Sequence, residues 1–258
     1  MNMTGLSDQE YMRYSAHLLL EDIGEQGQLA LRNAKVLIVG VGGLGAPVAL
    51  YLAAAGVGHL VLADDDHVEL SNLQRQIIFT QQQLKQTKVS AAKASLAQLN
   101  PHINVTVIEE RVTLDSAKNQ MADMLAQVDL VIDCSDNMPT RQAINKICVI
   151  QKIPLIVGAG IRMEGQLISF NAQLADSACY HCLYPFDDTG AVNNCSTSGV
   201  LGPLVGIVGS LQALEAIKYL TGMPLSSLNR LMRFDGKTLQ WQHLSVAKDP
   251  DCTVCASR

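Results

Sequence analysis

The chain has 258 residues, of which 48% are hydrophobic and 17% charged, and this composition excludes an intrinsically disordered protein. The net charge of −5 argues against nucleic-acid binding as the main activity. The first residues lack the basic and apolar regions of a signal peptide. Residues 36–63 hold no Asp, Glu, Lys or Arg, but glycines and Pro47 interrupt them. We therefore expect a cytoplasmic protein with no membrane span and no nucleic-acid partner.

The first 160 residues carry a pattern in which strands and helices alternate. Residues 7–33 are helical in pattern, and Ser7 followed by Glu10 is typical of a capping box at a helix start. Apolar runs then predict five strands, at 35–40, 59–64, 103–111, 128–136 and 153–160. Helices are expected between them, at about 87–99 and 139–151. Such alternation predicts an α/β fold with a Rossmann-like, doubly wound, mostly parallel sheet.

The pattern changes after Gly160. Segments 164–171 and 231–244 look like antiparallel strands, and they flank a polar loop at about 176–198 and an apolar helix at 203–220. We expect one domain over residues 1–258. Its three parts are N-terminal helices at 1–33, a nucleotide-binding part at 34–160, and a part at 161–258 that carries the antiparallel strands.

A glycine-rich turn follows the first predicted strand and precedes a helix. The segment "GVGGLG" places four glycines in it, at Gly40, Gly42, Gly43 and Gly45. In a G-x-G-x-x-G pattern these residues permit a tight turn, close approach of backbone to a phosphate, and close helix packing. Asp64 ends the next strand about 20 residues later, where a ribose-binding carboxylate belongs. The pattern predicts an adenine nucleotide without separating NAD from ATP, and a turn that binds nothing is the alternative.

A polar group follows Asp64 in the segment "ADDDHVELSNLQRQ". It contributes candidate ligands for the nucleotide, namely Asp66, Ser71, Asn72, Leu73, Gln74, Arg75 and Gln76, and Lys88 follows. Arg75 and Lys88 are cations suited to a triphosphate. A dehydrogenase would instead bury its second nucleotide against mostly apolar walls. A solvated loop that caps a helix is the alternative for this segment taken alone.

The fourth predicted strand ends in "DCSDN", which contains Asp133, Asp136 and Asn137. A carboxylate at the carboxyl end of a central strand lies where Mg²⁺ would bridge phosphates. Together with the glycine turn, this set favours ATP with magnesium over NAD. Asp64 would then hold the ribose, and Asn72 and Arg75 would hold phosphates.

Two C-x-x-C pairs lie in the last third of the chain, Cys179 with Cys182 and Cys252 with Cys255. Two such pairs can close a tetrahedral thiolate site around Zn²⁺. Four thiolate ligands leave no open position for water, so the predicted zinc is structural. Redox pairs or disulfides are the alternative, which a cytoplasmic chain disfavours.

The segments "VGVGGLG", "ADDDHVELSNLQRQIIF" and "DCSDN", with the two cysteine pairs, resemble the ThiF/MoeB/HesA family, bacterial relatives of ubiquitin-activating enzymes. The resemblance runs from about Asp8 to Cys255 and is greatest to the ThiF branch. It implies an adenylyltransferase that attaches AMP to the C-terminal Gly-Gly carboxylate of a ubiquitin-like sulfur carrier, ThiS-like, for thiamine biosynthesis, releasing pyrophosphate. It also implies a homodimer, zinc at the cysteine pairs, and a carrier-binding role for the zinc-bearing part at 161–258.

The resemblance assigns roles to individual residues. Arg75 and Lys88 would neutralise the phosphates, Asp136 would hold Mg²⁺, and Asp64 would bind the ribose. No general base is needed, because the attacking carboxylate is already ionised at neutral pH. MoeB-like activation of the molybdopterin carrier, a protein that only docks the carrier, and an NAD-dependent oxidoreductase remain alternatives.

Two positions depart from the family pattern. The family usually reads "RYxRQ" near its N-terminus, and its second arginine reaches the ATP site of the partner subunit, whereas this chain has Ala16 there. Arg13 or His17 are the candidates for a substitute. The resemblance also implies a covalent role for Cys195, but Ser196 follows it where an arginine that would favour the thiolate is usual. A plain loop cysteine is the alternative.

Overall fold

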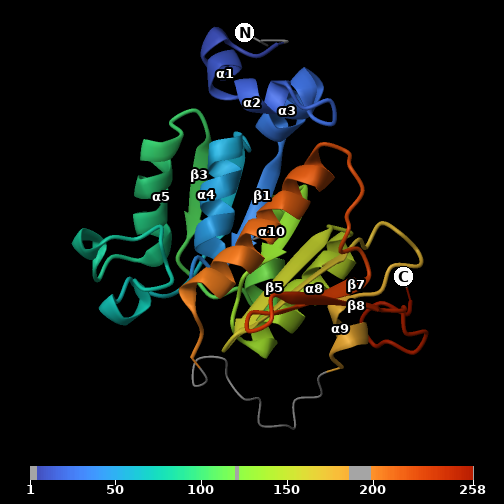
Figure 1. Cartoon of the computed structure of the whole chain (residues 1–258). Coiled ribbons are helices and arrows are strands. Elements are labelled where there is room, and N and C mark those ends of the chain that lie inside the picture. Colours follow the sequence, from blue (N-terminus) through green and yellow to red (C-terminus); the bar gives the residue numbers. More distant parts are fainter. Residues whose placement is uncertain (1–4, 120–121, 186–198, 258) are drawn as a thin grey trace.

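A computed structural model describes residues 5–119, 122–185 and 199–257 and contains one continuous sheet (Figure 1). Its eight strands lie in the order β3-β2-β1-β4-β5-β6-β7-β8. They are β1 (Lys35–Val39), β2 (His59–Ala63), β3 (Asn104–Ile108), β4 (Leu130–Asp133), β5 (Leu155–Ile161), β6 (Glu164–Phe170), β7 (Arg230–Asp235) and β8 (Gln240–Ser245). Strands β1 to β5 are parallel, and β6, β7 and β8 are antiparallel. The predicted Rossmann-like, mostly parallel sheet with antiparallel C-terminal strands is confirmed.

Helices cover both faces of this sheet, as the doubly wound prediction requires. The ten α-helices of the described chain are α1 (Asp8–Arg13), α2 (Ser15–Leu18), α3 (Gly24–Asn33), α4 (Gly45–Ala55), α5 (Lys88–Leu99), α6 (Leu114–Asn119), α7 (Ala122–Leu125), α8 (Met138–Gln151), α9 (Tyr180–Leu183) and α10 (Gly202–Leu220). Helices α4, α5 and α10 pack on one face, and α8 and α9 pack on the other. Alternate residues of each parallel strand therefore enter two separate hydrophobic cores.

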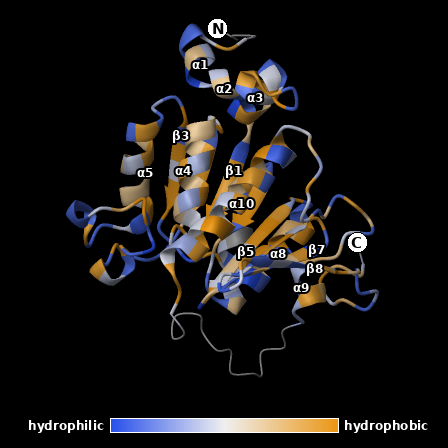
Figure 2. Cartoon of the chain, in the orientation of Figure 1, coloured by the Kyte–Doolittle hydropathy of each residue, from blue (hydrophilic) through white to orange (hydrophobic). Residues whose placement is uncertain are grey.

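The buried strands explain the near-continuous apolar runs of the sequence. Four of the five residues of β1 and of β2 are buried, and so is the whole of β4. Figure 2 shows hydrophobic residues concentrated on the central strands. A strand that is covered on both faces needs apolar side chains at successive positions, so it reads as a run and not as an alternation. Polar side chains can then enter this region only where the strands end.

The N-terminal segment, expected to be helical over 7–33, folds as three short helices. The capping box is confirmed: the Ser7 side chain accepts from the Glu10 amide, and the Glu10 carboxylate accepts from the Ser7 amide. A break at Tyr14 separates α1 from α2, and its ring packs against Gly56. These helices lie at the amino end of β1 (Figure 1), opposite the carboxyl ends of the parallel strands.

The polar segment expected as a loop at 176–198 contains one short helix, α9 (Tyr180–Leu183), in its described part. Cys195 lies outside the described residues. In the part of the chain that the structure covers, no helix is both long enough and apolar enough to cross a bilayer.

Candidate functional site

A cavity of about 360 Å³ opens at the carboxyl ends of β1, β2 and β4. This is the edge of a doubly wound sheet where ligands bind. The cavity brings together the glycine turn, the segment after β2 and the segment after β4. Its charged lining residues are Asp64, Asp65, Asp66, Glu69, Arg75, Lys88, Glu110, Arg111 and Asp136.

A larger hollow of about 650 Å³ lies at the opposite, amino end of the strands. Asp129 and Lys152 are its only charged lining residues in the described chain. A triphosphate needs several cations, so this hollow lacks the chemistry that the sequence predicts. The cavity at the carboxyl ends is therefore the candidate nucleotide site.

The glycine turn is shaped by contacts that a side chain would prevent. Gly40 has φ +87°, and a Cβ on it would lie 2.8 Å from the carbonyl oxygen of Cys134. A Cβ on Gly45 would overlap the carbonyl oxygen of Gly40. Gly42 and Gly43 line the cavity, whereas Gly45 does not and lets α4 begin directly against the turn. The turn thus exposes backbone at the start of a helix, an arrangement suited to phosphate.

Asp64 holds the glycine turn as well as facing the cavity. Its Oδ2 accepts from the Val41 amide at 2.7 Å, and its Oδ1 accepts from the Asp66 amide at 2.9 Å. Burial raises the pKa of this carboxyl above its ordinary value of 3.8, although Lys88 and the two amides oppose the shift. Its position after β2 is the one that a ribose-binding carboxylate occupies in this fold class.

Lys88 and Asp66 form an ion pair inside the cavity, with Nζ 2.8 Å from Oδ2. The lysine side chain is 6% exposed and the aspartate side chain 63% exposed. The ammonium is therefore buried at the first residue of α5, and an exposed carboxylate neutralises it. A buried cation of this kind can pair with a phosphate when an anion enters, because the exposed Asp66 carboxylate can be solvated by water in its place.

Arg75 lines the cavity beside the glycine turn. Its guanidinium donates to the side-chain oxygen of Asn72 at 2.9 Å and, more weakly, to the carbonyl of Ser71 at 3.4 Å. Among the described residues it has no carboxylate partner. Asn72 also lines the cavity, whereas Ser71, Leu73 and Gln74 do not.

The end of β4 and the segment after it place Asp136 and Asn137 at the cavity and bury Asp133. Asp136 is exposed and lines the cavity together with Asn137, whose side chain caps α8 by accepting from the Thr140 amide at 3.0 Å. Asp133 is wholly buried behind them, and burial raises its pKa. Arg141 of α8 donates to the carbonyls of Ser135 and Gly158, which fixes the turn that carries Asp136.

Several charged cavity residues were missing from the sequence prediction, namely Asp65, Glu69, Glu110 and Arg111. Arg111 pairs with Asp65 through Nη2 and Oδ2 at 3.0 Å, so the lining holds a third cation. Its position as the last residue of the strand predicted at 103–111, beyond the end of β3, was the available signal. Gln76 is 3% exposed and lines the cavity, and its Oε1 has no hydrogen-bond partner among the described residues. Gln76 was among the ligands predicted from the polar segment, but nothing in the sequence distinguished it from its neighbours.

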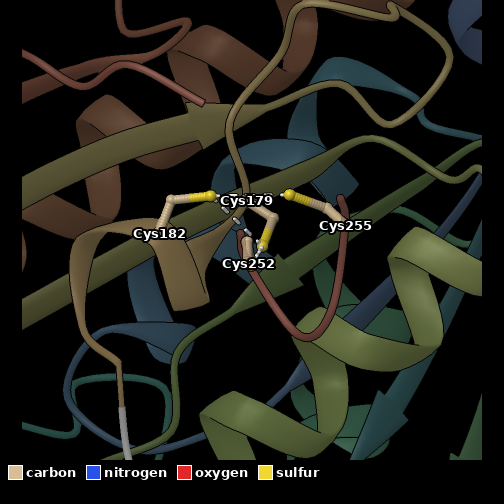
Figure 3. A group of neighbouring side chains, drawn as sticks. All are labelled: Cys179, Cys182, Cys252 and Cys255. Atoms are coloured by element: carbon tan, nitrogen blue, oxygen red, sulfur yellow. Dashed lines mark hydrogen bonds between the residues drawn. The ribbon is translucent and has the colours of Figure 1, made fainter. Parts of the chain in front are cut away.

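The four cysteines of the C-x-x-C pairs converge, as Figure 3 shows. All their sulfurs lie within 4.8 Å of one another, with Cys179–Cys182 at 3.9 Å, Cys179–Cys252 at 3.8 Å and Cys182–Cys255 at 3.4 Å. Thiolates around a tetrahedral zinc are about 3.8 Å apart, given Zn–S bonds of about 2.3 Å. The thiols are free, so neither pair is a disulfide here. The donor set and its spacing fit zinc.

The residues considered as substitutes for the missing arginine do not line the cavity of their own chain. Arg13 donates to the carbonyl of Leu99 at 3.1 Å, and His17 contacts Gln28 at 3.0 Å. Ala16 is exposed on α2 between them. All three lie at the amino end of the strands, away from the cavity.

Comparison with known proteins gives a consistent result. The sequence profile of the ThiF family matches residues 14–254. The sulfur carrier protein ThiS adenylyltransferase of Escherichia coli strain K12 is 47% identical over 250 residues, which cover 97% of each protein. The molybdopterin-synthase adenylyltransferase of the same strain is 43% identical over 253 residues, covering 98% of this chain and 99% of that protein.

Solved structures share the fold. A crystal structure of E. coli MccB with MccA-N7isoASN matches with a TM-score of 0.82 at 22% sequence identity. The match covers 98% of this chain and 75% of that one. At this identity the likeness shows the fold alone.

Proposed function

The chain belongs to the ThiF family, and from this premise we propose that it catalyses ATP-dependent adenylylation of the C-terminal Gly-Gly carboxylate of a ThiS-like, ubiquitin-like sulfur carrier. The observation that carries the proposal is the cavity. It combines a glycine turn that lines its wall, a carboxylate after β2, and the side chains of Arg75 and Lys88. This is the set that a nucleoside triphosphate requires, and thiazole formation for thiamine is the pathway in which a ThiS-like carrier serves.

The chemistry suits a site built from charges. A carboxylate oxygen of the carrier attacks the α-phosphorus of ATP, the bond from that phosphorus to the bridging oxygen breaks, and pyrophosphate leaves. Two anions repel each other in this step, so positioning and charge neutralisation supply the catalysis. Arg75 and Lys88 provide the neutralisation, and Asp64 orients the ribose. The carrier carboxylate is ionised at neutral pH and needs no base.

A magnesium ion completes the charge balance in this proposal. Asp136 would hold it, because an exposed carboxylate at this edge faces the same space as the phosphate-binding residues. When bound, the ion supplies positive charge to the phosphates. The acidic cluster of Asp64, Asp65 and Asp66 offers further oxygen ligands nearby.

Zinc in the cysteine cluster has a structural role in this proposal. The cluster joins the short helix α9 to the C-terminal segment. The side chain of Asn145 supports it from α8, accepting from the Tyr180 amide at 2.8 Å and lying 3.5 Å from the sulfur of Cys179. A metal there would tie α9 to the C-terminal segment within the region from 161 onward, which we propose receives the carrier. Asn145 connects this region to the helix that also carries Arg141.

We further propose that the enzyme is a cytoplasmic homodimer. Exposed apolar side chains support a partner surface, among them Met12 and Leu19 on the N-terminal segment, at 81% and 85% exposure. In a dimer, residues near Ala16 could approach the cavity of the partner, which their own chain does not allow.

Activation of a molybdopterin-synthase carrier is the second candidate. It is favoured by the 43% identity to an adenylyltransferase of that pathway. The adenylylation chemistry would be unchanged, and only the carrier would differ.

The test is ATP–[³²P]pyrophosphate exchange with three samples: no carrier, a ThiS-like carrier, and a molybdopterin-synthase carrier, the last two ending in Gly-Gly. We expect exchange that depends on the ThiS-like carrier. Exchange with only the molybdopterin carrier would favour the second candidate. Binding of a carrier without exchange would make the protein a docking partner and overturn the enzymatic proposal.

A further inference from the structure

Arg111 is a cation of the cavity to which the proposed phosphate chemistry assigns no role. It lies just beyond the end of β3, and its side chain is 57% exposed, so a ligand in the cavity can reach it. Its Nε donates to Oδ2 of Asp65 at 3.1 Å, and its Nη2 lies 3.0 Å from the same oxygen. Two contacts with one carboxylate fix the plane of the guanidinium as well as its position.

The anchoring aspartate places Arg111 beside the proposed ribose position. Asp65 directly follows Asp64, the carboxylate proposed to orient the ribose. In the sheet, β2 separates β3 from β1, and the glycine turn follows β1. A nucleotide with its phosphates at that turn and its ribose at Asp64 therefore directs its base away from the turn, toward the segment after β3.

The phosphate-binding residues form a separate part of the lining. A Cβ on Gly43 would lie 2.9 Å from the side chain of Val205 and 3.5 Å from that of Arg75, so these three residues lie together. Val205 and Leu44 line the cavity there, and both belong to the core on the face that α4 and α10 cover.

The apolar lining residues near Arg111 come from the other core. Val112 follows Arg111 and lines the cavity with Val39 and Ala63, the last residues of β1 and β2. All three belong to the core on the face that α8 covers. Phosphates need no apolar wall, whereas a planar base is bound mainly by apolar contact and stacking. The wall and the guanidinium together supply what an aromatic ring requires.

We propose that Arg111, held by Asp65, stacks its guanidinium on the adenine ring of ATP beside this apolar wall. The inference rests on the proposed function and names the side chain that binds the base, whereas Arg75 and Lys88 bind the phosphates. Arginine suits this contact because its hydrogen bonds to a carboxylate lie in the plane of the guanidinium and leave its faces free.

Fragments of ATP separate the base from the phosphates in a binding experiment. Dissociation constants of ATP, adenosine and tripolyphosphate are measured by displacement of radiolabelled ATP with excess Mg²⁺. In Arg111→Lys, which keeps the charge and loses the plane, we expect the constants of ATP and adenosine to rise about 3- to 10-fold. The constant of tripolyphosphate should be unchanged. Arg111→Met should weaken adenosine to at least the same extent.

The control is Arg230→Lys, which alters an exposed arginine on β7 outside the cavity and should leave all three constants unchanged. Unchanged adenosine binding in Arg111→Lys would overturn the stacking contact. Weaker tripolyphosphate binding with unchanged adenosine binding would place Arg111 against the phosphates instead. A wild-type protein that binds ATP and its fragments as expected, but gives no carrier-dependent exchange, would overturn the proposed function and not this contact.

Discussion

The nucleotide cavity and the cysteine cluster both gather residues that are distant in sequence, but they satisfy their polar groups in opposite ways. In the cavity, Lys88 and Arg111 each pair with an aspartate that is at least one-third exposed, and the Gln76 Oε1 has no hydrogen-bond partner in the part of the chain that the structure describes. In the cluster, the four sulfurs face one another, and three of the pairs lie 3.4 to 3.9 Å apart.

The contrast separates a site that exchanges its ligand from one that keeps it. An open cavity of about 360 Å³, with ion pairs whose aspartates are exposed to solvent, can admit and release a nucleotide at each turnover. Thiols that already converge leave no room for a substrate and suit a permanent ion. Substitutions in the cavity should therefore change rates, and substitutions in the cluster should change stability.

The largest effect is expected for Lys88→Met. Loss of one preorganised cation at the phosphates should lower the rate of carrier-dependent adenylylation on the order of 10²- to 10³-fold. Methionine fills similar space, so the melting temperature should change little. Steady-state exchange kinetics measure the rate, and Lys93→Met, an exposed lysine on the same helix, is the control. A loss below threefold would mean that Lys88 does not act on the phosphates.

The cysteine cluster should show the opposite result. Cys252→Ser removes one thiolate, and loss of the metal should lower the free energy of unfolding by about 2.7 kcal/mol if free zinc stands a hundredfold above its Kd. For a chain of this size that corresponds to a fall in melting temperature of roughly 8 °C. Calorimetry and zinc content by atomic absorption measure both quantities.

Cys148→Ala is the matched control for the cluster, since Cys148 is buried on α8 outside it. This variant should keep one zinc per chain. A Cys252→Ser variant that loses zinc but melts normally would contradict a structural metal.

A gain of function is expected for Ala16→Arg. The exposed position accepts a long side chain, and an arginine that reached the partner's phosphates should raise the exchange rate by about tenfold, a part of what such an arginine supplies in phosphoryl transfer. Ser15→Arg is the control, because one residue along a helix rotates the side chain by about 100°. Equal gains in both variants would indicate a non-specific effect of the added positive charge and not a contact between this arginine and the partner's phosphates.

The smallest effect concerns pH. Burial raises the pKa of Asp64 above 3.8, so the carboxylate that would bind ribose becomes protonated at a higher pH than an ordinary aspartate. ATP affinity, measured by titration calorimetry, should fall a few-fold as the pH drops from neutrality through this raised pKa. The stability of the free protein should depend on pH in the opposite direction. Asp64 binds its proton more tightly in the folded state than in the unfolded state. Its contribution to the free energy of unfolding is therefore full below pH 3.8 and is lost as the pH rises through the raised pKa. Asp64→Asn should remove both slopes.

Much of the fold could be predicted from the sequence, because buried parallel strands need runs of apolar residues and helix ends are marked by capping and helix-breaking residues. The helix expected at about 87–99 is observed as Lys88–Leu99, and that at 139–151 as Met138–Gln151. The break at Tyr14 and the short helix at 180–183 were not foreseen. They depend on tertiary contacts, such as the ring of Tyr14 against Gly56, which no local pattern encodes.

The residues that line the cavity were also easier to predict than the ion pairs and hydrogen bonds among them. Asp66 and Lys88 were both assigned to the nucleotide, and the structure shows that they form an ion pair with each other. Sequence spacing indicates which strand ends carry polar groups, but it does not say which of these groups are left without partners. The orphaned oxygen of Gln76 is visible only when burial and hydrogen bonds are known together.

The most direct test of the central claim is the mass of the carrier after incubation with ATP, Mg²⁺ and the enzyme. A ThiS-like carrier ending in Gly-Gly should gain one adenylyl group, added pyrophosphate should remove it, and Lys88→Met should abolish the gain on the same time scale. A carrier that keeps its mass while it binds the wild-type protein would contradict the account.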